Sequence, residues 1–242
     1  MHSESVRHLK RVDPVLAQVI ERVGPCRLEL RSEGTHFDAL LRSIIYQQLS
    51  GKAAATIHAR LRALFDDRAP TPAELLSASD EQLRGVGLSR QKLSYLRDLA
   101  SKVESGAVPL SADTIDHLGD DEIVERLVQV KGIGRWTVQM FLIFRLGRPD
   151  VLPDLDLGIQ NAIRRVYRMR RQPDPKDVLR IGSKWRPHAS VASWYLWRSL
   201  DAGREQNAGT KARPKRRKRT AAKTKQVARK KTARKRAPAR KR

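Results

Sequence analysis

A glycine turn followed by an apolar helical stretch is the first chemical feature of this sequence. Gly132-Ile133-Gly134 precedes a helix expected to begin at Arg135, and Lys131 lies directly before the turn. Glycines let a backbone approach a ligand closely, and the first N–H groups of a helix bind anions. The turn therefore predicts a phosphate site, with a plain connection between two helices as the alternative.

Two carboxylates follow that helix in the loop VLPDLD, at Asp154 and Asp156. A fixed carboxylate can stabilise an oxocarbenium-like transition state or orient the attacking water. Either aspartate could also cap a helix. A phosphate site one helix away from a carboxylate indicates an enzyme that binds a nucleic-acid backbone and acts on the sugar or base beside it.

Helical periodicity predicts the elements that position these residues. Apolar residues recur at i, i+3, i+4 and i+7 from Phe37 to Ile45 and again from Ala53 to Phe65. Segment 27–34 is expected to be extended, and no sheet is evident. Further helices are expected at Val6–Val23, Ala73–Ala78, Ser89–Val103, from Asp120 or Asp121 to Val130, and at Arg135–Leu146, Leu157–Tyr167, Lys176–Ile181 and Ala189–Leu200. The body therefore reads as all-α.

A second turn, Leu83-Arg84-Gly85-Val86-Gly87, weakly echoes the first and precedes the helix expected after Ser89. It does not lead towards a carboxylate loop. We therefore interpret this turn as a simple connection between helices.

Charge divides the chain into a globular body and a basic tail. Residues 208–242 contain 18 Lys/Arg and no Asp/Glu, and without them the net charge of +24 falls to +6. A segment so poor in apolar residues is expected to be disordered and to bind polyanions without reading sequence. We place the body at 1–205 and the disordered Lys/Arg-rich tail at 206–242.

Composition also excludes several classes of protein. One cysteine, Cys26, excludes an intrachain disulfide framework and a four-cysteine cluster. No apolar run approaches the ~20 residues of a membrane helix, and no signal peptide is evident. We expect no membrane association, no cofactor and a monomer, located in the cytoplasm with the nucleoid if bacterial or in the nucleus if eukaryotic.

Four motifs in order carry a family resemblance over roughly residues 35–200. They are SIIYQQLSGKAAATIHARL, VKGIGRWTVQMFLIF, DVLPDLDLGI and WRPHASVASWYLWR. Together they resemble the helix-hairpin-helix DNA glycosylases, in the branch of DNA-3-methyladenine glycosylase II. The resemblance implies two helical subdomains with a cleft between them and the helix-hairpin-helix motif at Lys131–Arg135 against the DNA backbone.

The resemblance also assigns the reacting groups. It implies that Asp156, rather than Asp154, is the catalytic carboxylate. Trp136 stands where strand-cutting members have a Schiff-base lysine, so water should be the nucleophile. Trp136 and Trp197 match aromatic residues of the base pocket, while Met140 and Leu157 stand where some relatives have tyrosines.

Two further sites follow from the same resemblance. The loop Gln47–Ser50 implies a side chain that fills the gap left by a flipped base, and both Gln48 and Leu49 are candidates. Main-chain carbonyls near Val128, Val130 and Ile133 would hold a monovalent cation. The expected substrate is double-stranded DNA with alkylated purines of the 3-methyladenine or 7-methylguanine type. The alternatives are a non-catalytic DNA-binding or DNA-compacting protein and a glycosylase for deaminated or oxidised bases.

Overall fold

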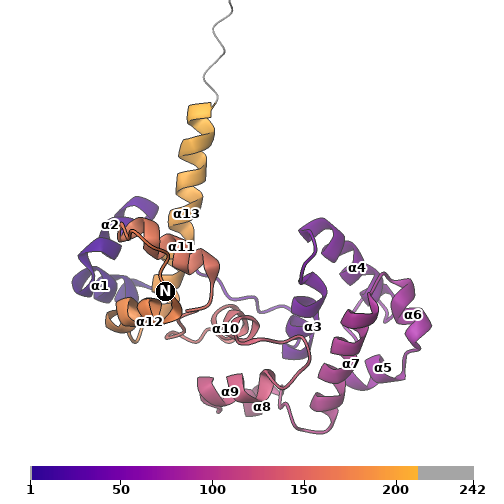
Figure 1. The fold of residues 1–242 in the computed structure, drawn as a ribbon. Coiled ribbons are helices and arrows are strands. Elements are labelled where there is room, and N and C mark those ends of the chain that lie inside the picture. Colours follow the sequence, from indigo (N-terminus) through magenta and orange to yellow (C-terminus); the bar gives the residue numbers. More distant parts are fainter. Residues whose placement is uncertain (1, 212–242) are drawn as a thin grey trace, which may run out of the picture.

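The computed structural model describes residues 2–211, and these are helical without a strand, as the sequence predicts (Figure 1). The helices in chain order are α1 (Ser3–Val12), α2 (Pro14–Val23), α3 (His36–Tyr46), α4 (Gly51–Ala63), α5 (Pro72–Ser77), α6 (Asp80–Gly85), α7 (Arg90–Glu104), α8 (Ala112–Ile115), α9 (Asp120–Leu127), α10 (Arg135–Phe144), α11 (Leu157–Val166), α12 (Pro175–Gly182) and α13 (Ala189–Lys211). A short 3-10 turn, Ser183–Trp185, joins α12 to the segment before α13.

The helices form two lobes, each with its own apolar core (Figure 1). The central lobe comprises α3–α10, and its core extends from Phe37 to Val151. The terminal lobe combines α1 and α2 with α11–α13, and α13 packs on α2 and α11. Leu28 and Trp197 are partly buried against both cores and mark the junction between the lobes. The expected pair of helical subdomains is therefore confirmed.

Side-chain caps explain where many of the helices begin. Thr35, Ser50, Ser89 and Asp174 each accept a hydrogen bond from a backbone N–H in the first turn of the helix that follows. Such bonds satisfy donors that the helix itself leaves unpaired. These local signals are the reason that a sequence pattern can place helix starts.

The prediction of one helix over Val6–Val23 is wrong, because the chain breaks at Asp13 into α1 and α2. Pro14 has no N–H to continue α1, and proline suits the first position of a new helix. Asp13 Oδ1 caps α2 by accepting from the N–H groups of Val15 and Leu16 at 3.1 and 3.0 Å. The apolar period alone runs through this break, whereas Pro14 marks it.

Asp13 also joins the N-terminal helices to the segments around Tyr167 and Trp185 inside the terminal lobe. Its carboxylate is fully buried and accepts hydrogen bonds from the Tyr167 hydroxyl and from Trp185 Nε1, the latter at 2.7 Å. Lys184 Nζ lies 3.1 Å from Oδ2. Burial raises the pKa of Asp13, but the hydrogen bonds from Tyr167, Trp185 and the backbone and the Lys184 contact outweigh burial and lower it.

Asp13→Ala should destabilise the protein by about 3 kcal/mol, because it leaves buried donors unpaired and removes a helix cap. In a body of this size that corresponds to a fall of about 10 °C in Tm.

The stability that Asp13 contributes should also depend on pH. Because its pKa is lower in the folded state than in the unfolded state, this contribution is present above the unfolded pKa and disappears as the pH falls through the folded pKa. Thermal unfolding at pH 7 and pH 3 should therefore show a smaller difference between wild type and variant at pH 3; an equal difference would contradict this origin.

Three further differences from the predicted elements are local. The short helices α6 and α8 were not expected, and Gly119, rather than Asp120 or Asp121, is the N-cap of α9. Helix α13 continues to Lys211, so the predicted end at Leu200 is wrong. Residues 212–242, most of the predicted tail, lie outside the described part of the chain.

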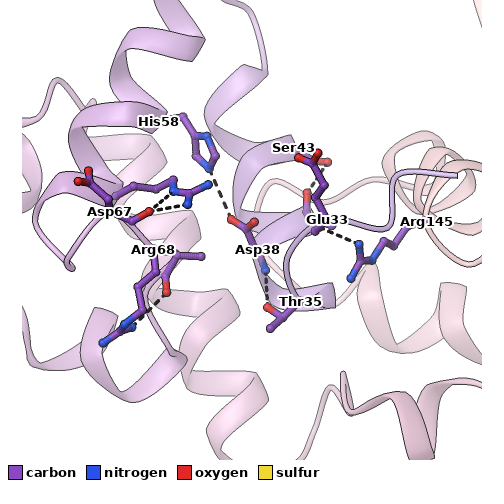
Figure 2. Close-up of polar contacts among 11 residues, drawn as sticks. Glu33, Thr35, Asp38, Ser43, His58, Asp67, Arg68 and Arg145 are labelled. Carbon is purple, nitrogen blue, oxygen red and sulfur yellow. Dashed lines mark hydrogen bonds and ion pairs between the residues drawn. The ribbon is translucent and has the colours of Figure 1, made fainter.

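One arginine, Arg145, joins the segment before α3 to the end of α10 (Figure 2). Arg145 donates to the carbonyls of Arg31 and Glu33 at 2.6 and 2.8 Å, to the carbonyl of Gly34, and to His36 Nδ1 at 3.0 Å. The pKa of His36 is lowered by burial and by the positive charge of Arg145. These bonds hold residues 31–34 in place without strand pairing; residues 33–34 form a bend with φ +70° at Gly34, so this end of the segment predicted at 27–34 is not extended.

No helix within residues 2–211 has the length and apolar character needed to cross a membrane.

Candidate active site

The predicted hairpin connects α9 to α10 and leaves the start of α10 open. Lys131, Gly132, Gly134 and Arg135 are exposed, whereas Ile133 is buried and fixes the turn to the central core. Gly134 is the N-cap of α10 and provides no side chain to pair with the first-turn N–H groups. Those groups are therefore directed at whatever approaches the hairpin, which suits a phosphate.

Gly132 is required by both its backbone angle and its neighbour. Its φ is +81°, and a Cβ placed there would lie 2.1 Å from the ring of Tyr95. The Gly132 carbonyl accepts from Gln47 Nε2 at 2.8 Å, and the Lys131 N–H donates to Asp98 Oδ2 at 2.8 Å. The hairpin is thus attached to α7 and to the loop after α3, which sequence patterns alone did not reveal.

Asp98 is the acidic anchor of this attachment. Burial raises its pKa, but hydrogen bonds from Lys102 and from the Lys131 backbone outweigh that effect, and the pKa is lowered. Asp98 therefore remains an acceptor for the hairpin N–H down to acidic pH.

The turn Leu83–Gly87 provides an internal comparison. Gly87 has φ +106° and packs against Ile57 of α4, while Ser89 Oγ accepts from the Lys92 N–H and closes the start of α7. The helix after the Leu83–Gly87 turn is therefore capped by a side chain, whereas the helix after the Gly132 turn begins without a side-chain cap. This difference supports the interpretation of the Leu83–Gly87 turn as a connection only.

Asp156 lies one helix beyond the hairpin and is held by three N–H donors. Oδ1 accepts from the Ile159 backbone at 2.7 Å and from Trp197 Nε1 at 2.9 Å, and Oδ2 accepts from Trp136 Nε1 at 2.6 Å. The bond from Ile159 makes Asp156 the N-cap of α11, so the carboxylate serves in helix capping as well. Its side chain is almost fully buried at the junction of the lobes.

Asp154 has a different environment. It is also buried, and its Oδ1 lies 3.3 Å from both Gln139 Nε2 and an Arg135 guanidinium nitrogen. Its carbonyl accepts from Gln160 Nε2 at 3.0 Å. Asp154 therefore secures the loop between α10 and α11 and holds the first residue of α10.

The structure brings two of the four predicted pocket residues onto Asp156. Trp136 is 46% exposed, and Trp197 is half-buried and stacked on Phe144 with ring centroids 5.7 Å apart. Leu157, directly after Asp156, is 65% exposed, whereas Met140 is partly buried against the central core. The two tryptophans thus bring apolar rings to the carboxylate, and the pocket roles of Trp136, Trp197, Met140 and Leu157 stay predictions.

The remaining tryptophans belong to the core of the terminal lobe. Trp185 is fully buried and donates to Asp13, and Trp194 is 7% exposed with its ring edge-on to Tyr195. Both are distinct in environment from the pair at Asp156.

The predicted wedge loop projects from the end of α3 next to the hairpin. Gln48 and Leu49 are both exposed, and Gln48 has φ +56°, a strained value for a residue with a side chain. Lys92 of α7 holds the start of this loop, since its Nζ donates to the carbonyls of Ile44 and Gln47 at 2.9 and 2.8 Å and also to that of Ile45. Burial lowers the pKa of this amine.

Lys92→Met should loosen the wedge loop while keeping an apolar stem of similar length. We expect a loss of about 2 kcal/mol in stability, because buried helix-end carbonyls lose their donor. Base flipping, followed by 2-aminopurine fluorescence opposite the loop, should weaken. Lys176→Met, at an exposed position of α12, is the matched control and should change neither; equal flipping by both variants would contradict a supporting role for Lys92.

The carbonyl site for a monovalent cation stays a prediction. The Ile133 N–H donates to the Val130 carbonyl at 3.0 Å, and this bond fixes the turn that carries Val128, Val130 and Ile133. Within residues 2–211 there is no group of three His, Cys, Asp or Glu side chains that could hold a metal ion.

Comparison with known proteins identifies the family to which this helical fold belongs. Residues 41–188 match the family model of the HhH-GPD superfamily base excision DNA repair proteins. The chain therefore belongs to the HhH-GPD superfamily.

Individual relatives and solved structures are similar to most of this chain. The chain is 36% identical over 194 residues to DNA-3-methyladenine glycosylase 1 of Schizosaccharomyces pombe, covering 79% of this chain and 85% of the relative. The structure of that organism's 3-methyladenine DNA glycosylase Mag1 in complex with abasic DNA superposes with a TM-score of 0.71 at 34% identity, over 82% of this chain and 97% of the other. A Bacillus halodurans DNA-3-methyladenine glycosidase gives 0.76 at 36% identity, over 84% and 92%.

Proposed function

We propose that this protein is a monofunctional DNA glycosylase that excises alkylated purines in base excision repair. The observation that carries the proposal is a buried carboxylate, Asp156, bonded by Trp136 and Trp197 and one helix away from an uncapped hairpin. The names of the relatives at 34–36% identity support the same activity and substrate class.

The reaction follows from the chemistry of the side chains. The hairpin Lys131–Arg135 binds a phosphate, and Gln48 or Leu49 fills the space of the flipped nucleotide. The flipped alkylated purine is electron-poor and suits the faces of Trp136 and Trp197. As the bond from C1′ to the base nitrogen breaks, its electron pair leaves with the base, and the Asp156 carboxylate stabilises the positive charge on the sugar.

Water completes the reaction. Its oxygen bonds to C1′, its proton is released, and the products are an abasic site and the free base. An indole cannot form the Schiff base through which strand-cutting members act, so Trp136 supports base removal without strand cleavage. We propose that the protein acts as a monomer on double-stranded DNA.

A panel of duplexes, each with one lesion, tests the proposal by chromatography of released bases. The panel should contain 3-methyladenine, 7-methylguanine, hypoxanthine and 8-oxoguanine. Release of the two methylated bases alone is the expected result. Release of only the deaminated or oxidised base would overturn the substrate class, and normal duplex binding without release of any base would identify a non-catalytic DNA-binding protein.

A further inference from the structure

The two oxygens of Asp156 have unequal surroundings. Oδ1 accepts two N–H bonds, from Ile159 and Trp197, whereas Oδ2 accepts one, from Trp136. Each carboxylate oxygen has about two lone-pair sites. Oδ1 is therefore fully used by the protein, and Oδ2 retains one site for a substrate atom or water.

Packing encloses Oδ1 further. A Cβ on Gly158 would lie 2.9 Å from Oδ1 and 3.1 Å from Trp197 Cδ1, so this side has no free space. Trp197 is itself stacked on Phe144, and Ile159 is fully buried. The donors to Oδ1 belong to α11 and α13 of the terminal lobe and form a fixed wall.

Oδ2 accepts its one hydrogen bond from the other lobe. Its donor, Trp136, is 46% exposed and lies in the first turn of α10. That turn begins directly after Gly134, the uncapped end of the hairpin. The same helical turn therefore presents N–H groups to a phosphate and an indole N–H to Oδ2.

We propose that Oδ2 is the oxygen that acts on the sugar, and that Trp136 is a positioning residue whose indole N–H holds Oδ2 in place. This inference rests on the proposed function and adds a second role to an aromatic side chain at the base pocket. An indole N–H only donates, so it fixes the carboxylate as an acceptor without competing for a proton. Because Trp136 shares a turn with the hairpin, phosphate binding and alignment of Oδ2 are linked by one rigid element.

Trp136→Phe separates the two roles, since phenylalanine keeps a stacking ring and lacks the N–H. With full-length protein and a duplex containing one 7-methylguanine, the single-turnover rate at saturating enzyme should fall by about tenfold to a hundredfold. Affinity for the duplex should be unchanged. Trp194→Phe, the same exchange at a buried position whose indole has no hydrogen bond to Asp156, is the matched control and should keep the wild-type rate. A wild-type rate for Trp136→Phe would overturn the positioning role.

NMR of the ¹⁵N-labelled protein tests the hydrogen bond without activity. The indole N–H signal of Trp136, assigned as the one lost in Trp136→Phe, should move strongly in Asp156→Asn and stay unmoved in Asp154→Asn. An indole N–H signal that does not shift in Asp156→Asn would overturn the hydrogen bond. This measurement does not require Trp136→Phe to be active. If the wild type released no base at all, both the proposed function and the catalytic role of Oδ2 would be overturned. The NMR result would still show whether Trp136 donates a hydrogen bond to Asp156.

Discussion

Asp156→Asn should reduce base excision by about 10³-fold or more, while duplex affinity changes little. The variant removes the negative charge that opposes the developing charge on the sugar. It also places an amide among three N–H donors at 2.6–2.9 Å, so one oxygen acceptor is lost. Single-turnover release of 7-methylguanine, with affinity measured by fluorescence anisotropy, gives both quantities.

Asp154→Asn is the matched control for this prediction. Asp154 is also buried and lies in the same loop, but its partners are Gln139 and Arg135 rather than the tryptophans. We expect it to keep most of the excision rate. Comparable losses in both variants would mean that loop structure, rather than the charge of Asp156, is being measured, and an active Asp156→Asn protein would exclude the mechanism.

Gly132→Ala should disable the hairpin. The added Cβ would lie 2.1 Å from the Tyr95 ring, and alanine disfavours φ +81°. Overpacking and backbone strain together should cost about 3 kcal/mol, or about 10 °C in Tm. Because the hairpin also sets the start of α10, excision should fall by about 100-fold even below the melting temperature.

Two companion variants distinguish packing from phosphate contact. Gly134→Ala adds a Cβ that meets nothing within 4 Å, at an ordinary φ of −96°, so stability should be unchanged while duplex affinity falls. Tyr95→Ala in combination with Gly132→Ala should recover part of the lost stability, since the two effects share one contact. Equal Tm losses for both glycine variants would contradict the assigned clash.

The sequence was sufficient for features that depend on neighbours along the chain. Apolar periodicity placed most of the helices, and the spacing of Gly132, Gly134 and Asp156 placed the hairpin and carboxylate relative to one helix. It failed where a short-range signal was misread, as at Asp13-Pro14, or where no periodic signal exists, as in the short helices α6 and α8.

The tertiary structure decided what surrounds each of those residues. Trp197 and Asp156 are 41 positions apart, Gln47 and Gly132 are 85 apart, and Asp13 and Trp185 are 172 apart. Which side chains meet at such separations depends on how helices pack across two cores, and no local pattern encodes that. The sequence by itself thus determined which residues could react, and only the packing of the lobes determined that one oxygen of Asp156 accepts from two protein donors and the other from one.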